Sequence, residues 1–227
     1  MKRRIRGFSR RFSIPVLAAA IACTAMFPGI AAGGGPAPIP LPSPQTDGGM
    51  PLMRALSLRA TSRAFSPEPL PLQTLSNLLW AAWGINRPAE GKRTAPSARN
   101  RQEIDLLVVR ADGTFLYDAP ANRLVPVAAG DHRAATGAQS FVKDAPVTLV
   151  LVADMTRMKG AEKDPEQLQM AWADAGYISQ NIYLFCASEG LATGARAWVD
   201  RPALAKALGL KEHQVILLAQ SVGKPAR

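Results

Sequence analysis

The sequence has few of the residues on which catalytic and metal sites are most often built. It contains two cysteines and two histidines among 227 residues. Two cysteines cannot form a disulfide framework, and Cys186 lies in an apolar helical pattern where a small buried residue is more usual than a catalytic thiol. His132 and His213 have no carboxylate or cysteine at metal-ligand spacing, so we expect no metal site.

Common nucleotide-binding and hydrolase motifs are missing as well. The sequence contains no G-x-G-x-x-G, no P-loop, no G-x-S-x-G and no H-E-x-x-H, and paired carboxylates are scarce. The net charge is +10, but six basic residues lie among the first eleven, and without them it is 10 − 6 = +4. The other Lys and Arg residues are scattered without interleaved aromatic residues, so we do not expect nucleic-acid binding.

The N-terminus has the pattern of an export signal over residues 1–31. A basic region ends at Arg11, an apolar Ala-rich stretch covers residues 14–30, and Gly29-Ile30-Ala31 offers a cleavage site. Prolines interrupt the apolar stretch, which disfavours a membrane anchor. We therefore predict a periplasmic or otherwise exported protein whose mature chain has no stable membrane span.

Two features leave the export route open. Ser9-Arg10-Arg11-Phe12 resembles the twin-arginine signal, which carries folded proteins, although Ser13 replaces the usual apolar residue. Cys23 is an alternative lipidation site, and the weak lipobox before it disfavours that reading.

Residues 32–49 are rich in proline and glycine and read as a linker. The run GGGPAPIPLPSPQTDGG has nothing to bury, so we expect it to be extended and mobile. The folded domain is then predicted to cover residues 50–227.

The stretch from Asp164 to Gly190 predicts one long core helix. Asp164 suits the N-cap, Pro165 the first helical position and Gly190 the C-terminal end. Apolar residues recur at helical spacing and continue on the other faces, so the helix should be buried against neighbouring elements or a second subunit. Small residues that allow another backbone to approach closely are Ala171, Ala173, Ala175, Gly176 and Ser179.

The other elements alternate irregularly, which predicts an α+β fold. Strands are expected at 104–110, 114–117, 147–153 and 215–219, with an extended segment at 192–199. Helices are expected at 51–59, 72–83, 131–138 and 202–208. Residues 85–100 form a basic, proline-containing loop without an apolar anchor, so we expect something outside the core to order them.

Cationic and hydroxyl side chains gather at the ends of these elements, a combination that suits a phosphate-bearing ligand. They are Arg59, Thr61, Ser62, Arg63, Ser97, Asn100, Lys224 and Arg227. Spacing alone favours the alternative that they are solvated surface groups.

Four stretches resemble the nitroreductase superfamily in their order and spacing. They are RATSRAFSPEPLPLQTLSNLLWAAWGINR, RTAPSARNRQEIDLLVV, DAGYISQNIYLFCASEGLATGARAWVD and LLAQSVGKP, and the resemblance as a whole covers residues 50–225. Within that superfamily they are most similar to the branch of thiazole- and oxazole-forming, SagB-type dehydrogenases. The resemblance implies a sheet flanked by helices round a long central core helix, with FMN bound at a homodimer interface.

The resemblance also implies roles for individual residues. Arg59, Thr61 and Arg63 match the family's R-x-S-x-R motif, which holds the FMN phosphate and ribityl chain, and Lys224 matches a C-terminal phosphate-binding position. Arg227 is a weaker match to the same site, and Gln139 is a match for the pyrimidine edge of the flavin. Residues matching the segment that reaches the flavin from the partner subunit are Pro96, Ser97, Ala98 and Asn100. Those matching the segment near the isoalloxazine ring are Gly194, Ala195 and Arg196.

The resulting hypothesis is an exported FMN-dependent oxidoreductase that works by ping-pong hydride transfer through flavin N5. No protein acid or base is then obligatory, because the cofactor carries the chemistry. Its partners would be a second copy of the chain, a small-molecule substrate and an electron donor that the sequence does not identify. One alternative is a non-catalytic flavin-binding or partner-binding module with this fold. Another is an enzyme that oxidises azolines during peptide maturation.

Overall fold

The computed structural model describes residues 37–158 and 164–226. The predicted signal peptide and Arg227 lie outside the described residues. Within them, no helix is both long and apolar enough to cross a membrane.

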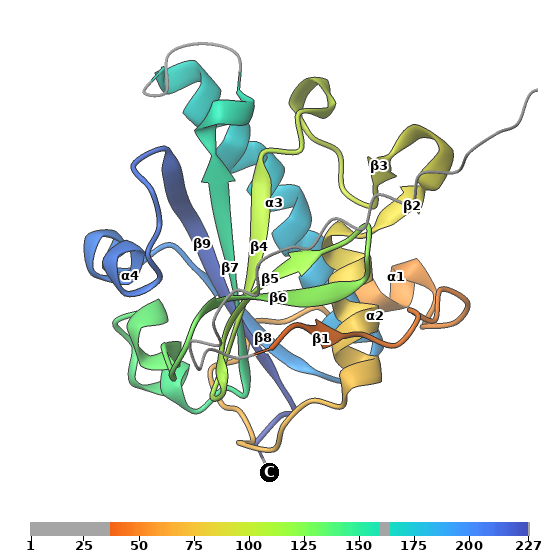
Figure 1. The fold of residues 1–227 in the computed structure, drawn as a ribbon. Coiled ribbons are helices and arrows are strands. Elements are labelled where there is room, and N and C mark those ends of the chain that lie inside the picture. The colour runs from red at the N-terminus through yellow and green to blue at the C-terminus, as the bar shows by residue number, and fades with distance from the viewer. Residues whose placement is uncertain (1–36, 159–163, 227) are drawn as a thin grey trace, which may run out of the picture. The chain divides into compact units, whose positions relative to one another are not determined.

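A seven-stranded antiparallel sheet forms the centre of the described part (Figure 1). Its strand order is β1-β6-β5-β4-β7-β9-β8. The strands are β1 (Ile39–Pro40), β4 (Ile104–Arg110), β5 (Gly113–Asp118), β6 (Arg123–Ala128), β7 (Val147–Asp154), β8 (Ala192–Arg196) and β9 (Gln214–Gly223). The helices are α1 (Leu52–Leu58), α2 (Leu72–Trp83), α3 (Pro165–Ser188) and α4 (Arg201–Ala207). The α+β prediction is therefore confirmed.

The sheet separates two apolar cores because successive side chains of a strand point to opposite faces. Leu106 and Val108 of β4 belong to the larger core, which also contains the buried residues of α2 and α3. Leu107 and Val109 belong to the smaller core, which contains Leu204 of α4. The continuous apolar run of β7 is explained by burial on both faces of the sheet.

The predicted core helix is confirmed as α3. Asp164 caps its N-terminus by accepting a hydrogen bond from the Glu166 N–H. Its buried face includes Ala171, Ala175, Ile178, Ser179, Ile182 and Cys186. Within the chain α3 is not buried all round, because a stripe along one face of the helix is exposed, so full burial would need the second subunit that the sequence analysis allowed. That exposed stripe consists of Ala173, Gly176, Tyr177 and Gln180.

The prediction that residues up to 49 bury nothing is also wrong. Ile39 and Pro40 form β1, which pairs with Leu124 and Arg123 of β6. Leu41 is buried in the larger core. The proline-rich composition did suggest an extended chain, but an extended chain can also add a short edge strand, so the folded domain includes residues well before Met50.

The basic loop at 85–100 is ordered within the chain. Strands β2 (Ile85–Arg87) and β3 (Lys92–Arg93) form a small separate hairpin. The Arg93 guanidinium stacks over the Trp83 ring at 4.7 Å and donates to the Trp83 carbonyl at 2.7 Å. An arginine thus replaces the apolar anchor that the sequence lacks, and it anchors the segment within the chain.

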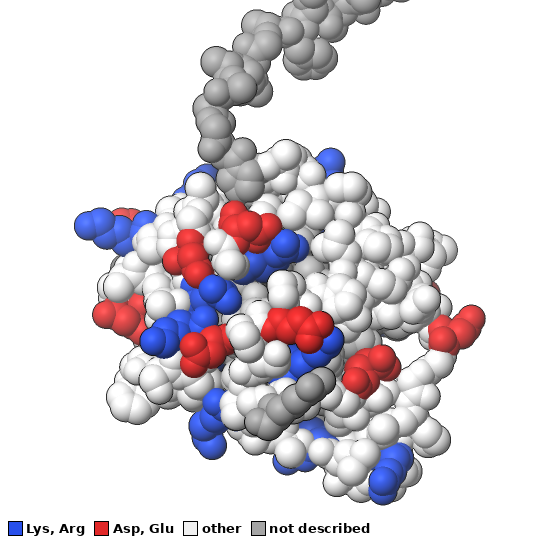
Figure 2. Space-filling view, turned by 90° about the horizontal axis from the view of Figure 1, so that it is seen from below, with Lys and Arg blue, Asp and Glu red and all other residues white. Residues whose placement is uncertain are grey.

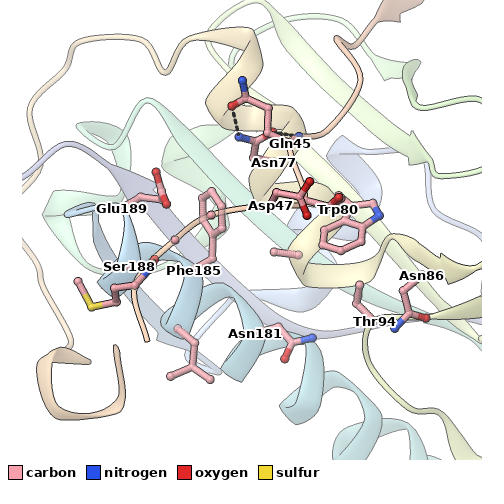
Figure 3. Close-up of a pocket in the computed structure, with 16 residues that line it drawn as sticks. Gln45, Asp47, Asn77, Trp80, Asn86, Thr94, Asn181, Phe185, Ser188 and Glu189 are labelled. Carbon is pink, nitrogen blue, oxygen red and sulfur yellow. Dashed lines mark hydrogen bonds between the residues drawn. The ribbon is translucent and has the colours of Figure 1, made fainter. Parts of the chain in front are cut away.

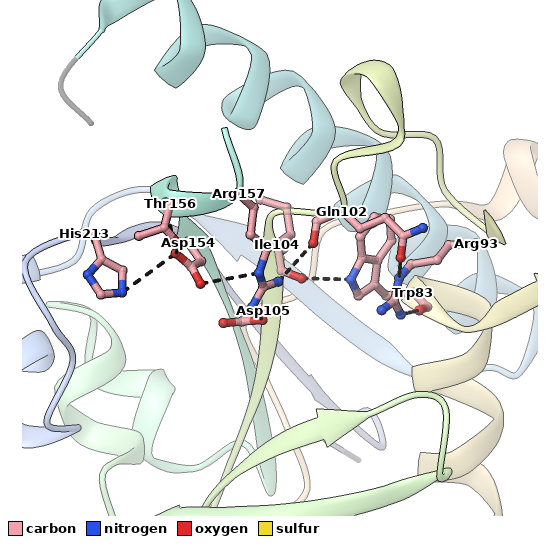
Figure 4. Close-up of polar contacts among 9 residues, drawn as sticks. All are labelled: Trp83, Arg93, Gln102, Ile104, Asp105, Asp154, Thr156, Arg157 and His213. Carbon is pink, nitrogen blue, oxygen red and sulfur yellow. Dashed lines mark hydrogen bonds and ion pairs between the residues drawn. The ribbon is translucent and has the colours of Figure 1, made fainter. Parts of the chain in front are cut away.

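A polar chain continues from this anchor to the end of β7 (Figure 4). Arg93 also donates to Gln102, whose carbonyl accepts a hydrogen bond from Arg157. Arg157 pairs with Asp105 at 2.7 Å and with Asp154 at 3.3 Å. These contacts fix the start of β4 and its preceding loop against the end of β7.

Candidate functional site

The predicted phosphate-binding residues follow α1 and lie along the edge strand β8. We call residues 59–63 the arginine segment. The Ser62 N–H donates to the Thr193 carbonyl at 2.8 Å. A Cβ atom added to Gly194 would lie 2.7 Å from the Ser62 carbonyl oxygen, so glycine there allows this close approach. The structure therefore brings Arg59, Thr61 and Arg63 together with Gly194 and Ala195.

Tyr183 of α3 organises this group. Its Oη atom lies 3.0 Å from Thr61 Oγ1 and accepts a hydrogen bond from the Ala195 N–H at 2.9 Å. The Arg59 guanidinium lies 5.4 Å from the centre of the Tyr183 ring, within cation–π range. The sequence does not single out Tyr183, because its polar partners come from loops and strands distant in the chain.

Arg59 and Arg63 are exposed, and neither side chain forms a hydrogen bond or ion pair with another described residue. Together with the Thr61 hydroxyl, they present two guanidinium groups and one hydroxyl to solvent. Guanidinium groups make their strongest hydrogen bonds with anions such as phosphate. The arginine segment can therefore bind an anionic group without breaking an existing ion pair.

Lys224 lies close to the same part of the chain but is engaged. Its carbonyl accepts a hydrogen bond from the Ser66 N–H, and Phe65 forms a β-bridge with Pro225. Its Nζ atom lies 2.6 Å from Glu68 Oε1 in an exposed ion pair. A cavity of about 400 Å³ is lined by residues 65–68 and 224–226. A phosphate would have to compete with Glu68 for this lysine.

Arg196 differs from the other predicted site arginines because it is buried. Its Nε and Nη2 atoms donate to the carbonyl and hydroxyl of Thr136, and Nη1 donates to Ser221. Burial lowers the pKa of Arg196 to about 10. Its guanidinium thus joins β8 and β9 to the 3₁₀ turn Arg133–Thr136, and all three of its nitrogens donate within the chain.

Gln139 carries an unsatisfied polar atom beside this arginine. Its Oε1 atom is buried and has no hydrogen-bond partner among the described residues. A Cβ added to Gly137 would lie 2.9 Å from Oε1 and would also meet Arg196. Buried carbonyl oxygens are nearly always hydrogen-bonded in folded proteins. Gln139 is therefore available to a ligand.

The Pro96–Asn100 segment lies at the other half of α3. The Ala98 N–H donates to Asp174 at 2.7 Å, and Ser97 and Asn100 accept hydrogen bonds from Gln102. Nine residues separate Asp174 from Tyr183, or roughly 13 Å of helix at 1.5 Å per residue. One chain therefore does not bring this segment to the arginine segment.

A second buried carboxyl lies beside Asp174. Glu103 is fully buried, and neither of its oxygens has a hydrogen-bond partner among the described residues. Burial, reinforced by the nearby Asp174 carboxylate, raises the pKa of Glu103 to about 7. No spacing rule could have found this pair, because Glu103 precedes β4 and Asp174 lies in α3.

No cluster of three or more potential metal ligands occurs among residues 37–158 and 164–226. The Nitroreductase family model matches residues 56–224, which is most of the chain. The chain belongs to the nitroreductase family. A Methanocaldococcus jannaschii protein that bears the nitroreductase name is 28% identical over 171 residues, covering 70% of this chain and 85% of that protein.

Solved structures support the same assignment. The structure of a candidate nitroreductase from Ralstonia eutropha JMP134 has a TM-score of 0.80 and 41% identity, and covers 89% of this chain and 96% of that one. A candidate nitroreductase from Desulfovibrio desulfuricans, solved in complex with FMN, has a TM-score of 0.58 at 22% identity, covering 78% and 88% of the two chains. The latter shows a shared fold, and the FMN belongs to that protein.

Proposed function

We propose that this nitroreductase-family protein is an exported FMN-dependent oxidoreductase. The observation that carries the proposal is the arginine segment, where two exposed guanidinium groups and a hydroxyl lie beside the Gly194–Ala195 edge of the sheet. When bound, FMN would supply hydride transfer through its N5 atom. Arg59, Arg63 and Thr61 would hold its phosphate and ribityl chain, and Tyr183 would keep the Thr61 hydroxyl in place.

The residues fit FMN unevenly. Gln139 fits, because its buried Oε1 atom has no hydrogen-bond partner among the described residues and a flavin N–H could donate to it. Lys224 fits only if it leaves Glu68. Arg196 would act indirectly, by fixing β8 and the turn before Gln139, because each of its three guanidinium nitrogens already donates a hydrogen bond within the chain.

We also propose a homodimer. The Pro96–Asn100 segment and the arginine segment lie at opposite halves of α3, so a second copy running antiparallel across the exposed stripe would bring them together. That stripe contains Gly176 and the half-exposed Tyr177. Helix α1 adds Leu52 and Met53, which are 62% and 77% exposed, a large apolar exposure for helix side chains.

The substrate is proposed to be a small molecule, reduced or oxidised in a ping-pong cycle with a separate electron donor. Membership of the SagB-type branch, and with it azoline oxidation, is a narrower proposal that rests on the sequence resemblance. A flavin-binding module without turnover is the alternative from another class. Purified protein that holds FMN but is neither reduced by a donor nor reoxidised would favour that module.

The test is the absorption spectrum of the purified protein, followed by acid release and identification of the cofactor. We expect FMN at about one equivalent per chain. Arg59→Ala with Arg63→Ala should weaken FMN binding by several kcal/mol, at about 1.5–3 per charged hydrogen bond. Arg54→Ala is the matched control, since Arg54 is an exposed arginine of α1 outside the segment. Equal FMN affinity in all three proteins would refute the phosphate assignment.

A further inference from the structure

A pocket separate from the arginine segment lies between α2, the C-terminal half of α3 and residues 45–50 (Figure 3). Its volume is about 510 Å³, within the range of small-molecule sites. Aromatic walls come from Trp80 and Phe185, and polar groups come from the amides of Asn77, Asn86 and Asn181. None of these residues belongs to the group around Tyr183, which consists of Arg59, Thr61 and Ala195.

Residues 45–50 form a strap that is tied at both ends. At one end the Gln45 N–H donates to Asn77 Oδ1 at 2.8 Å, and Asn77 Nδ2 donates back to Gln45 Oε1 at 3.2 Å. At the other end the Met50 N–H donates to Ser188 Oγ at 2.8 Å. Gly49 has a φ of +78°, and a Cβ there would lie 3.0 Å from Ser188 Oγ. The strap is therefore a built wall of the pocket that crosses from α2 to α3.

The charge of the lining is opposite to that of the chain. The sequence has 27 Lys and Arg residues against 17 Asp and Glu residues. The pocket lining nevertheless contains Asp47 and Glu189 and none of the chain's lysines, arginines or histidines. Both carboxylates and both aromatic rings are seen around the pocket in Figure 3.

Two features of the pocket favour ligand binding, namely an indole ring of fixed orientation and a buried hydroxyl without a hydrogen-bond partner among the described residues. Trp80 Nε1 donates to the Ile85 carbonyl at 3.3 Å, which fixes the orientation of the indole ring. Thr94 Oγ1 is buried and has no hydrogen-bond partner among the described residues, although buried hydroxyls are normally satisfied. Aromatic faces attract organic cations, and nearby carboxylates strengthen that preference.

We propose that this pocket binds a small planar organic cation, held against Trp80 and Phe185 with Asp47 and Glu189 neutralising its charge. A ligand hydrogen-bonding group would satisfy the Thr94 hydroxyl. Within one chain, this site shares no residue with the proposed cofactor site.

Three ring compounds of similar size test the proposal on the full chain: N-methylquinolinium as a cation, quinoline as its neutral counterpart and quinoline-4-carboxylate as an anion. Isothermal titration should show N-methylquinolinium binding at least tenfold more tightly than quinoline, with the carboxylate weaker still. Asp47→Asn with Glu189→Gln should remove this preference while leaving quinoline binding unchanged. Asp144→Asn with Glu212→Gln is the control, because it makes the same change in net charge at exposed residues outside the pocket.

Three results would overturn the proposal. They are equal affinity for the three compounds, a cation preference that survives in the Asp47/Glu189 variant, or no binding of N-methylquinolinium at millimolar concentration. Asp47→Asn alone changes one exposed side chain of the strap and should reduce the preference partially, so the test does not depend on the double variant folding.

Discussion

Three arginines of the candidate site differ in what their guanidinium groups contact. Arg59 and Arg63 face solvent, whereas Arg196 is 7% exposed and donates to Thr136 and Ser221. A sequence pattern treats all three as cations available to a ligand. Arg196 is not available to a ligand in this way, because a buried guanidinium group must find its hydrogen-bond partners inside the protein.

Arg196→Ala should therefore destabilise the flavin-free protein. The change removes the donors to the carbonyl and hydroxyl of Thr136 and one of the two side-chain contacts of Ser221, and it opens a cavity, so we expect a loss of about 3 kcal/mol or more in the free energy of unfolding. Urea denaturation of apoprotein measures this loss. Arg63→Ala is the control and should change stability by less than about 0.5 kcal/mol. Equal stability of the two variants would show that the Arg196 contacts are not structural.

Glu103 should make stability fall as the pH rises. Its folded-state pKa of about 7 is above the unfolded value of about 4.3, so the native state holds the proton more tightly than the unfolded chain. The resulting stabilisation is fully present below about pH 4.3 and is lost as the pH rises to about 7. Glu103→Gln should remove this loss, which is about 4 kcal/mol over the whole range and about 3 kcal/mol between pH 5 and pH 8.

The measurement is the free energy of unfolding at pH 5 and pH 8 for the wild type, Glu103→Gln and the exposed control Glu212→Gln. Other groups also titrate across this range, so the informative quantity is the difference between variants. A pH dependence in Glu103→Gln that matches the wild type would contradict the prediction.

At the scale of elements, the described N-terminal segment, residues 37–50, contributes more to the packing of the fold than its proline-rich composition suggests. Leu41 is buried, and its carbonyl and that of Pro42 accept hydrogen bonds from the Asn122 side chain. The segment thus connects β6 to α2 before it reaches the strap. Leu41→Ala should cost about 2 kcal/mol by cavity formation. Thermal or urea unfolding measures this loss of stability. The control is Leu72→Ala, because Leu72 is an exposed leucine of α2. Similar losses in both variants would mean that Leu41 is not anchored in the core.

How well each element could be predicted depended on where its stabilising contacts lie. Helices α2 and α3 and strands β4 and β7 bury continuous or periodic apolar sets, so their sequences carry the signal themselves. Strands β1 and β6 contain prolines and are stabilised by pairing Ile39 with Leu124, which is distant in sequence. No local pattern encodes such a pairing.

The candidate site shows the same limit. Arg59, Thr61 and Arg63 could be proposed from the sequence because the family motif places them in one short segment. Tyr183 was missed, since its hydroxyl function depends on Thr61 and Ala195 lying beside α3 in the fold. The pocket behind the strap was also missed, because the sequence alone favoured a mobile linker there.

At the scale of the whole molecule, part of the charge of the described residues is neutralised in ion pairs. On the face shown in Figure 2, Lys and Arg side chains lie among Asp and Glu side chains rather than in a patch of one sign. Among the described residues, Arg123–Asp118 and Arg133–Asp131 are close ion pairs, at 2.8 and 2.7 Å. The positive net charge of the chain therefore does not produce an extended basic stripe on that face.

The proposed export has a consequence for the electron donor. Nicotinamide nucleotides are cytosolic, so a mature protein outside the cytosol would need a quinol, a redox protein or its own substrate as donor. We predict that NADH and NADPH reduce the bound flavin slowly compared with dithionite. Stopped-flow bleaching of the flavin absorption band measures this, and rapid saturable reduction at micromolar NAD(P)H would contradict it.

The proposed dimer can be tested at Gly176, in the middle of the exposed stripe of α3. A Cβ added there meets no atom within 4 Å inside the chain, so a larger side chain causes no clash in the monomer. Gly176→Arg should therefore leave the fold intact, and replacing a helical glycine should favour α3 itself by roughly 0.5–1 kcal/mol. In the dimer the same side chain would stand between two closely packed helices. We expect light scattering at micromolar concentration to give the mass of two chains for the wild type and for the exposed control Ala203→Arg on α4, but one chain for Gly176→Arg. A dimer that survives Gly176→Arg would mean that the chains associate through another surface, and the Pro96–Asn100 segment would then not reach the partner's arginine segment.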